Sequence, residues 1–438
     1  MPVWCKTAPA LGGSMRTVLA RLTGLFRKIG IWRLFRVGGV RGSITLANLA
    51  VFALLGHLHG GDAIGAFASY LAFTTLAGGF FSAGFPEMLM RRAALIDVRS
   101  FARLKRWRSA FWFGALLAAL VASPASVALV WVLRSKAEID LPWIAAIGPV
   151  VFSLNLLLSE EMRGRGKAEL SLFITNFATI LAPLGYLAVS ILLPAHEVLT
   201  ALVLTHIVSG LGLVMIFMST STRVDLSASR ALALLKAMSP VDLASMALMR
   251  VFSGGASHVM VLLAAGLGSP VLAGFVAVAA RLAGLAATFT GIVNASFARR
   301  VGAAQKFPDQ LKALFALTAA ISFAGVGVLM LPILLFPDQF LALFAVSPEL
   351  ANAGLGLQIL AGARIIRSLA GVSDLFLLVL GRAYIELMAT FLGFVALVMT
   401  VSLLPVTALG AAISLTVSVI VHGLISGLGA WSSFHRKI

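Results

Sequence analysis

The sequence has little charge, few acidic residues and almost no cysteine. Only 11% of its 438 residues are charged, whereas about a quarter are charged in soluble globular proteins. Hydrophobic residues make up 60%, and the mean hydropathy is +1.02. This composition excludes a water-soluble globular protein. Cys5 is the single cysteine, which excludes an intrachain disulfide and a CxxC metal or redox site. We therefore expect no bound metal and no cofactor.

Long apolar runs fill most of the chain. A hydrocarbon core of about 30 Å requires about 20 apolar residues in a helix. Twelve segments meet this requirement, and turn-forming residues such as Gly60-Gly61-Asp62 and Gly268-Ser269-Pro270 separate them. The sequence predicts an all-α polytopic membrane protein with helices at 43–58, 64–85, 109–133, 142–158, 169–193, 197–218, 240–265, 271–296, 311–336, 350–380, 383–404 and 407–431.

Basic residues are distributed unequally between the connections. Of the 34 Lys and Arg residues, 28 fall in alternate connections that would share one side of the membrane. Only Arg134 and Lys136 fall on the other side. Short loops rich in Lys and Arg remain in the cytoplasm, so we expect both termini there. The net charge of +18 then reflects topology and contact with anionic membrane lipids, and no nucleic-acid partner is expected.

The segments divide into two sets of six. A basic segment at 1–42, expected to remain in the mature chain, precedes an N-lobe at 43–218. A basic, Ser-rich linker at 219–239 leads to a C-lobe at 240–431 and a tail at 432–438.

An internal repeat supports this division. Gly65 precedes the pair Arg91-Arg92 by 26 residues, and Gly274, which lies 209 positions after Gly65, precedes Arg299-Arg300 by 25. Two lobes of six helices each have the same orientation, so a parallel repeat would relate them about an axis along the membrane normal.

Several short motifs resemble those of a transporter family. The turn Gly60-Gly61-Asp62 is followed by Gly-Ala-Phe at 65–67, and the helix after it ends in Gly84-Phe85-Pro86 before Arg91-Arg92. The loop Arg163-Gly164-Arg165-Gly166-Lys167, the pair Gly381-Arg382 and the segment 406–412 occur in matching order. Over residues 40–430 the chain resembles the Wzx-type oligosaccharide flippases of the multidrug/oligosaccharidyl-lipid/polysaccharide exporter superfamily.

That resemblance implies a function. It implies two lobes that alternate in access and carry a lipid-diphosphate-linked oligosaccharide from the inner to the outer leaflet, for cell-surface polysaccharide synthesis. The implied partners are that lipid-linked oligosaccharide and, in the same pathway, a polysaccharide polymerase and export proteins. The implied protein is a transporter and not an enzyme.

Four arginines lie inside the predicted spans. A guanidinium at mid-bilayer is costly unless it faces protein or water. Arginine is also the side chain best suited to bind a diphosphate through paired hydrogen bonds. We hypothesise that they bind the diphosphate and acidic sugar groups of the cargo. Alternatively, Arg364 and Arg367 on span ten brace helices together with Asp374, which lies two turns further along the same stripe. In this alternative Arg281 on span eight snorkels. The four are Arg250, Arg281, Arg364 and Arg367.

Other ionisable residues in the spans are candidates for ion coupling or gating. His206 and His258 could titrate near neutral pH, although lone histidines in helices are more often packing residues. Asp374 is the best acidic candidate, and Asp242 lies near the cytoplasmic entrance of span seven.

Two other functions remain open. A cation-coupled multidrug exporter of the same superfamily would carry cationic cargo and usually present carboxylates, whereas the spans here hold more arginines than acids. A membrane-embedded polysaccharide polymerase or ligase would need a sizeable outer loop with catalytic groups, and the predicted outer connections are short. The sequence therefore favours an exporter of anionic cargo.

Overall fold

The computed structural model describes residues 31–82, 84–86, 88–89, 101–136, 141–165, 167–189, 195–220, 240–305, 307–346 and 350–433. Within these ranges, all regular secondary structure is helical and no strand occurs, which confirms the all-α prediction. Most of the predicted linker, of the predicted C-terminal tail and of the predicted basic N-terminal segment lies outside the described residues.

Fourteen α-helices follow one another along the described chain, together with the short 3-10 helix η2 (Trp143–Ile147) and the π-helical turn η3 (Phe177–Leu181). They are α2 (Ile31–Phe81), α4 (Phe101–Lys136), α5 (Gly148–Gly164), α6 (Ala168–Asn176), α7 (Ala182–Val189), α8 (Ala195–Thr220), α10 (Pro240–Leu267), α11 (Pro270–Ala303), α12 (Pro308–Leu335), α13 (Pro337–Ala342), α14 (Ala353–Ser368), α15 (Ser373–Val379), α16 (Ala383–Leu403) and α17 (Ala408–Ser433).

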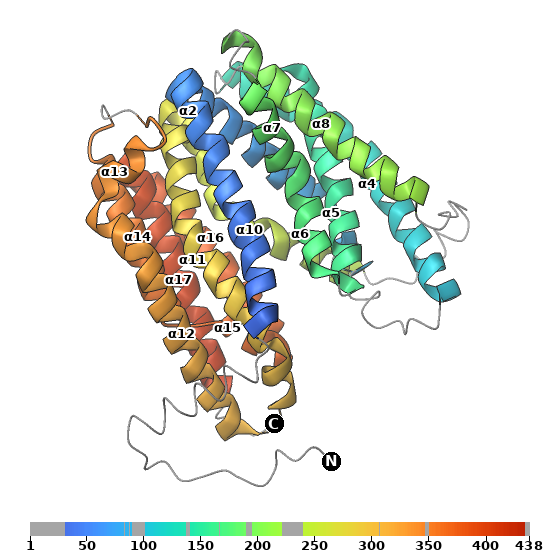
Figure 1. Cartoon of the computed structure of the whole chain (residues 1–438), viewed down its shortest axis with the longest axis vertical. Helices are drawn as coiled ribbons and strands as arrows, with labels where there is room; N and C mark the ends of the chain where they lie inside the picture. Colours follow the sequence, from blue (N-terminus) through green and yellow to red (C-terminus); the bar gives the residue numbers. More distant parts are fainter. Residues whose placement is uncertain are drawn as a thin grey trace.

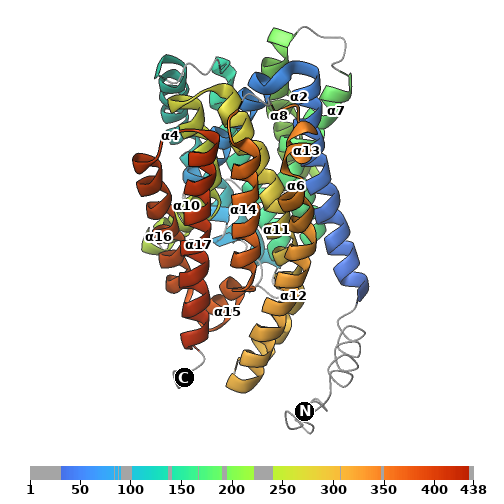
Figure 2. The same cartoon turned by 90° about the vertical axis from the view of Figure 1, so that its left-hand side faces the viewer.

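The helices form two groups (Figure 1). One group holds α4 to α8, and the other holds α11 to α17, in which α12, α14 and α17 run side by side (Figure 2). Helix α2 begins and α17 ends at the same end of the molecule, which we call the terminal end. The opposite end, where α2 turns at Gly60, is called the turn end.

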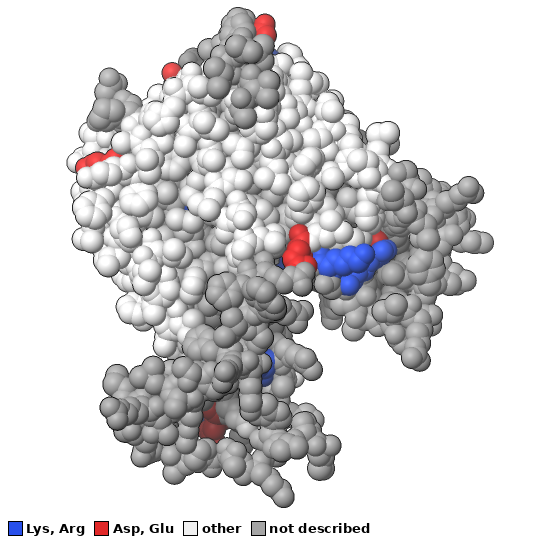
Figure 3. All heavy atoms as spheres, in the orientation of Figure 1, with Lys and Arg blue, Asp and Glu red and all other residues white. Residues whose placement is uncertain are grey.

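Eight described helices are long and apolar enough to cross a membrane, or nine if the bent helix α4 counts as one span. Helix α2 contains both the first and the second predicted spans, because Gly60 has a non-helical backbone conformation with φ 83° and the chain turns there. Helix α10 and the pair α14–α15 complete the correspondence with the twelve predicted segments. The space-filling view shows the expected surface, with a mostly uncharged band between the two ends (Figure 3).

The predicted tenth span is not one helix. Helix α14 ends at Ser368 and α15 begins at Ser373, with Gly371 between them at φ +58°, a left-handed conformation that side chains with a Cβ rarely adopt. The prediction that Arg367 and Asp374 lie on one stripe of an unbroken helix is therefore wrong.

The first half of α2 packs along α11, a helix from the other half of the chain. The largest apolar core joins these two helices to most of the others, and Phe52, Phe67 and Phe275 are buried in it. In a bilayer, helices associate through close packing and not through the exclusion of water. Shape-matched side chains and small residues must therefore hold this junction.

Two glycines allow the halves to meet at the turn end. A Cβ added at Gly65 would overlap the carbonyl oxygen of Pro270, and one added at Gly274 would lie 3.0 Å from the carbonyl oxygen of Gly61. Pro270 follows Gly61, and Gly274 follows Gly65, by the same 209 positions found in the sequence repeat. The two contacts are thus counterparts under that repeat. We refer to them as the glycine crossing.

Candidate binding and coupling sites

Arg281 lies between α11 and the first half of α2. Its Nε donates a hydrogen bond to Asn48 Oδ1 at 3.0 Å, and one Nη donates to the carbonyl oxygen of Ala277 at 3.0 Å. The guanidinium carbon stands 3.6 Å from the centre of the Phe52 ring. A cation over an aromatic face gains electrostatic attraction, most of all where water is excluded. These contacts join the two helices, so Arg281 has a bracing role, which the sequence had suggested only for the arginines of span ten.

We expect Arg281→Lys to weaken this junction. Lysine keeps the charge but cannot reproduce the planar stack on Phe52 together with the hydrogen bond to Asn48. Loss of one charged hydrogen bond costs about 1.5–3 kcal/mol of folding free energy. Thermal unfolding of the purified protein measures this loss, with Lys312→Gln on α12 as the control. Unchanged stability with loss of cargo binding would instead support a direct role in binding.

Arg364 and Arg367 lie one turn apart on α14. Both are partly buried, and Arg364 Nε is a buried donor without a hydrogen-bond partner. The stem of Arg367 packs against Gly423 of α17, where an added Cβ would overlap Arg367 Cδ. The electrostatic neighbours of Arg367 include Asp374 and Glu386, whereas the neighbour of Arg364 is Arg367 itself. The two guanidiniums therefore differ, because Arg367 has anionic neighbours whereas Arg364 has a donor without a hydrogen-bond partner.

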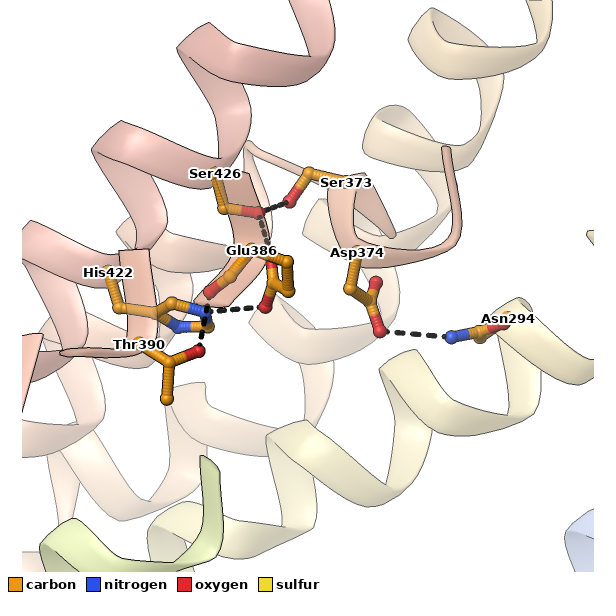
Figure 4. Close-up of polar contacts among 7 residues, drawn as sticks. All are labelled: Asn294, Ser373, Asp374, Glu386, Thr390, His422 and Ser426. Atoms are coloured by element: carbon orange, nitrogen blue, oxygen red, sulfur yellow. Dashed lines mark hydrogen bonds and ion pairs between the residues drawn. The ribbon is translucent and has the colours of Figure 1, made fainter. Parts of the chain in front are cut away.

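Polar side chains from four helices meet near the terminal end of the second group (Figure 4). His422 Nε2 lies 2.7 Å from Glu386 Oε1, and the Ser426 hydroxyl donates to Glu386 Oε2 at 2.7 Å. Ser426 also lies 2.6 Å from the hydroxyl of Ser373. We call these residues, together with Asp374 and Asn294, the polar cluster.

Asp374 forms the second half of this cluster. It lies in the first turn of α15, and Asn294 Nδ2 of α11 donates to its Oδ2 at 3.1 Å. Figure 4 shows its carboxylate directed towards Asn294 and away from His422. The cluster thus holds two carboxylates and an imidazole, with Arg367 as an electrostatic neighbour. Groups of these types can exchange a proton or hold a cation.

Glu386 and His422 are not among the site residues predicted from the sequence. Their signal was present, because each is an ionisable residue inside a segment that is otherwise strongly apolar. Glu386 follows the Gly381-Arg382 turn closely enough to be taken for a helix-end residue. Only the pairing of α16 with α17 shows that it meets a histidine.

His206 lies in the other group of helices. Its Nδ1 is 2.5 Å from the hydroxyl of Tyr70, and the two rings meet edge to face. Both side chains are fully buried, and His206 Nε2 has no hydrogen-bond partner. This arrangement fits the packing alternative, in which the histidine fastens α8 to α2.

The remaining predicted residues are all on α10. His258 is partly buried, with Arg281 as its charged neighbour. Arg250 and Asp242 lie on the same helix, but their side chains fall outside the described part of the structure. Within the described part, no group of three His, Cys, Asp or Glu side chains could hold a metal ion.

Solved structures share this fold over almost the entire chain. An inward-facing MATE-family multidrug resistance transporter of the MOP superfamily matches with a TM-score of 0.63 and 16% identity, covering 91% of this chain and 98% of its own. A MATE structure in a bent conformation gives 0.58 and 16%, covering 92% and 94%. A MOP-superfamily transporter from Pyrococcus furiosus gives 0.57 and 16%, covering 93% and 96%.

No protein-family model matches the sequence, and no curated protein matches it. The structural likeness shows the fold: the chain is folded like the MATE transporters of the MOP superfamily. The identities are low, so the likeness does not extend to a cargo.

Proposed function

We propose that this protein is an exporter of the bacterial inner membrane that translocates a lipid-diphosphate-linked oligosaccharide for cell-surface polysaccharide synthesis. Alternating access between the two groups of helices would carry the cargo, with both termini in the cytoplasm. A polysaccharide polymerase and export proteins would act after it. The MATE fold supports the transporter class of this proposal.

The unpaired donor of Arg364 is the observation that supports an anionic cargo. A buried guanidinium normally has its donors satisfied, because an unpaired buried donor costs about 1–3 kcal/mol. Arg364 Nε lacks a hydrogen-bond partner, and the neighbouring charge is a second arginine. Two guanidiniums one turn apart offer the fixed, planar donors that a diphosphate requires.

Reversed charge is known within this fold. The Pyrococcus furiosus transporter is described as having a binding pocket of reverse polarity, which suggests a different function for it. A binding pocket that differs in polarity from that of other members thus has a precedent in this fold, and this supports a cargo other than a drug.

A cation-coupled multidrug exporter is the second candidate, and the polar cluster favours it. Asp374 and Glu386 add two carboxylates to the spans of the second group. Carboxylates inside spans are typical of proton and cation pathways. The cluster is also compatible with cation-driven export of an anionic cargo, so only the cargo distinguishes the two candidates.

Reconstitution distinguishes them directly. We expect proteoliposomes to translocate a fluorescent polyprenyl-diphosphate disaccharide, measured as dithionite-accessible label, and to leave ethidium gradients unchanged. Efflux of ethidium without translocation of the diphosphate lipid would establish the drug exporter instead.

We expect Arg364→Gln to lower diphosphate-lipid translocation about tenfold or more, since a charged hydrogen bond contributes about 1.5–3 kcal/mol. Arg364→Lys should recover part of the rate, because it restores the charge without the planar fork. Lys312→Gln serves as the control for loss of one positive charge. Normal translocation by Arg364→Gln at normal abundance would remove this arginine from cargo binding.

A further inference from the structure

A small cavity lies where three helices meet near the terminal half of the molecule. Its volume is about 290 Å³, and α2, α6 and α11 line it. This volume is close to the lower limit of about 300 Å³ for sites that hold small ligands. The cavity is therefore large enough for a phosphate or diphosphate group. Its lining residues are Arg41, Ile44, Thr45, Leu172, Ala287 and Thr288.

Arg41 is the one charged residue of this lining. It belongs to the basic segment predicted from the sequence, yet it lies inside α2 and is partly buried. Its Nε is a buried donor without a hydrogen-bond partner, and one Nη occupies the space left by Gly291 of α11, where an added Cβ would overlap it. The fold thus makes room for this guanidinium without pairing it.

The charge near Arg41 is positive. Its electrostatic neighbour is Arg163 at the end of α5, whose side chain is 56% exposed and lies 3.5 Å from Glu160. The exposed Arg163, Arg165 and Lys167 follow one another at the end of α5, and the two arginines form ion pairs with Glu160 and Glu161 of the same helix. Figure 3 shows basic atoms with acidic atoms beside them on this face of the molecule. Among the described residues, no carboxylate lines the cavity or pairs with Arg41, so the guanidinium favours an anion over a cation there.

Two hydroxyl groups complete the donor set. Thr45 Oγ1 donates to the carbonyl oxygen of Arg41 at 2.9 Å and lies 3.3 Å from Thr288 Oγ1. Because Thr45 gives its proton to Arg41, Thr288 is the donor in this second contact, and a ligand oxygen in the cavity would have to replace Thr45 as the acceptor of the Thr288 proton. A guanidinium with an adjacent hydroxyl is a donor set suited to phosphate oxygens.

We propose that this cavity is a binding subsite for a phosphate or diphosphate ester, held by Arg41 and Thr288. The inference rests on the proposed function and deepens it by adding, besides the Arg364 site, a second site at which the diphosphate of the cargo binds. Leu172 of α6 also lines the cavity, so the subsite lies where one group of helices meets the other. Occupancy of the subsite is thereby linked to the relative position of the two groups.

Binding to the full-length protein in phosphatidylcholine nanodiscs tests the subsite. Decyl diphosphate and inorganic pyrophosphate are the two probes, measured by calorimetry, so that a lipid-borne group is distinguished from a free anion. We expect Arg41→Gln to weaken the binding of decyl diphosphate about tenfold to a hundredfold and Thr288→Val about two- to tenfold. Arg41→Lys should lie between wild type and Arg41→Gln.

The controls separate this inference from the proposed function. Lys312→Gln, which removes a positive charge from α12, should bind as wild type does, and melting temperatures identify any variant that is misfolded. Wild-type affinity in both Arg41→Gln and Thr288→Val, with diphosphate-lipid translocation intact in wild type, overturns the subsite and leaves the proposed function standing. Absence of both binding and translocation in wild type overturns the two together. Tighter binding of pyrophosphate than of decyl diphosphate would show that the subsite binds a free anion, and this result would overturn its assignment to the diphosphate ester of the cargo.

Discussion

Gly65→Ala is expected to force the turn end of the protein open. The added Cβ would overlap the carbonyl oxygen of Pro270, and because that atom belongs to the backbone, no side-chain rotation can relieve the overlap. Overpacking of this kind costs about 1–3 kcal/mol. If the two ends of the molecule open in turn, such a cost shifts the equilibrium between the two states about 5- to 150-fold. Cargo transport should fall accordingly.

Spin-label distances between the two halves measure this shift. Cys5 is the single cysteine, so Cys5→Ser gives a background for labels at the exposed Asp62 and Leu267 of the turn end. Gly65→Ala should lengthen the distance between the labels. Gly212→Ala on α8 is the matched control, because an added Cβ meets no atom within 4 Å there. Equal distances and equal transport in the two variants would show that the glycine crossing does not limit the conformational change.

Glu386→Gln is expected to disrupt the polar cluster. The carboxylate accepts a hydrogen bond from Ser426 and pairs with His422, both at 2.7 Å, and an amide cannot accept at both positions with a full charge. Loss of a charged hydrogen bond costs about 1.5–3 kcal/mol. We expect a lower unfolding temperature in detergent and, if the cluster couples transport to an ion gradient, transport that no longer responds to that gradient.

A double-mutant cycle with His422→Gln separates the pair from its surroundings. The two residues are in contact, so the effects of the substitutions should not add. Asp309→Asn, an exposed carboxylate in the first turn of α12, is the control for the change from acid to amide. Additive effects in the cycle would contradict an interaction between Glu386 and His422. Full gradient dependence in a stable Glu386→Gln protein would remove the glutamate from coupling.

Hydropathy and turn residues were sufficient to predict the helical architecture. Continuous apolar runs report burial in a bilayer, and every predicted segment corresponds to a described helix or a pair of helices. The break in the tenth span could not be predicted in this way. Hydropathy averages over a window, and the left-handed Gly371 that separates α14 from α15 lies among apolar neighbours. A single glycine inside a helix pattern does not by itself indicate a break.

The candidate sites were less predictable than the fold. The sequence correctly brought Arg367 and Asp374 into one neighbourhood, but for a wrong reason, because no continuous helix connects them. Glu386 meets His422 through the packing of α16 on α17, which no spacing along the chain encodes. Arg41 shows a further limit. A basic residue near the end of a membrane span normally indicates only which end faces the cytoplasm. Arg41 differs from such residues because its guanidinium occupies the space beside Gly291, which the sequence does not reveal.

The glycine crossing also determines how much work is needed to open the turn end in each transport cycle. Each pair of touching heavy atoms contributes only about 0.1–0.2 kcal/mol of dispersion attraction. A contact of backbone against glycine, which has no side chain, joins few such pairs. Parting this local contact, as distinct from the close-packed junction along the rest of α2 and α11, therefore costs little free energy. Moving one elementary charge through a membrane potential of 100 mV releases about 2.3 kcal/mol. A single ion per cycle would then supply enough work to part this contact.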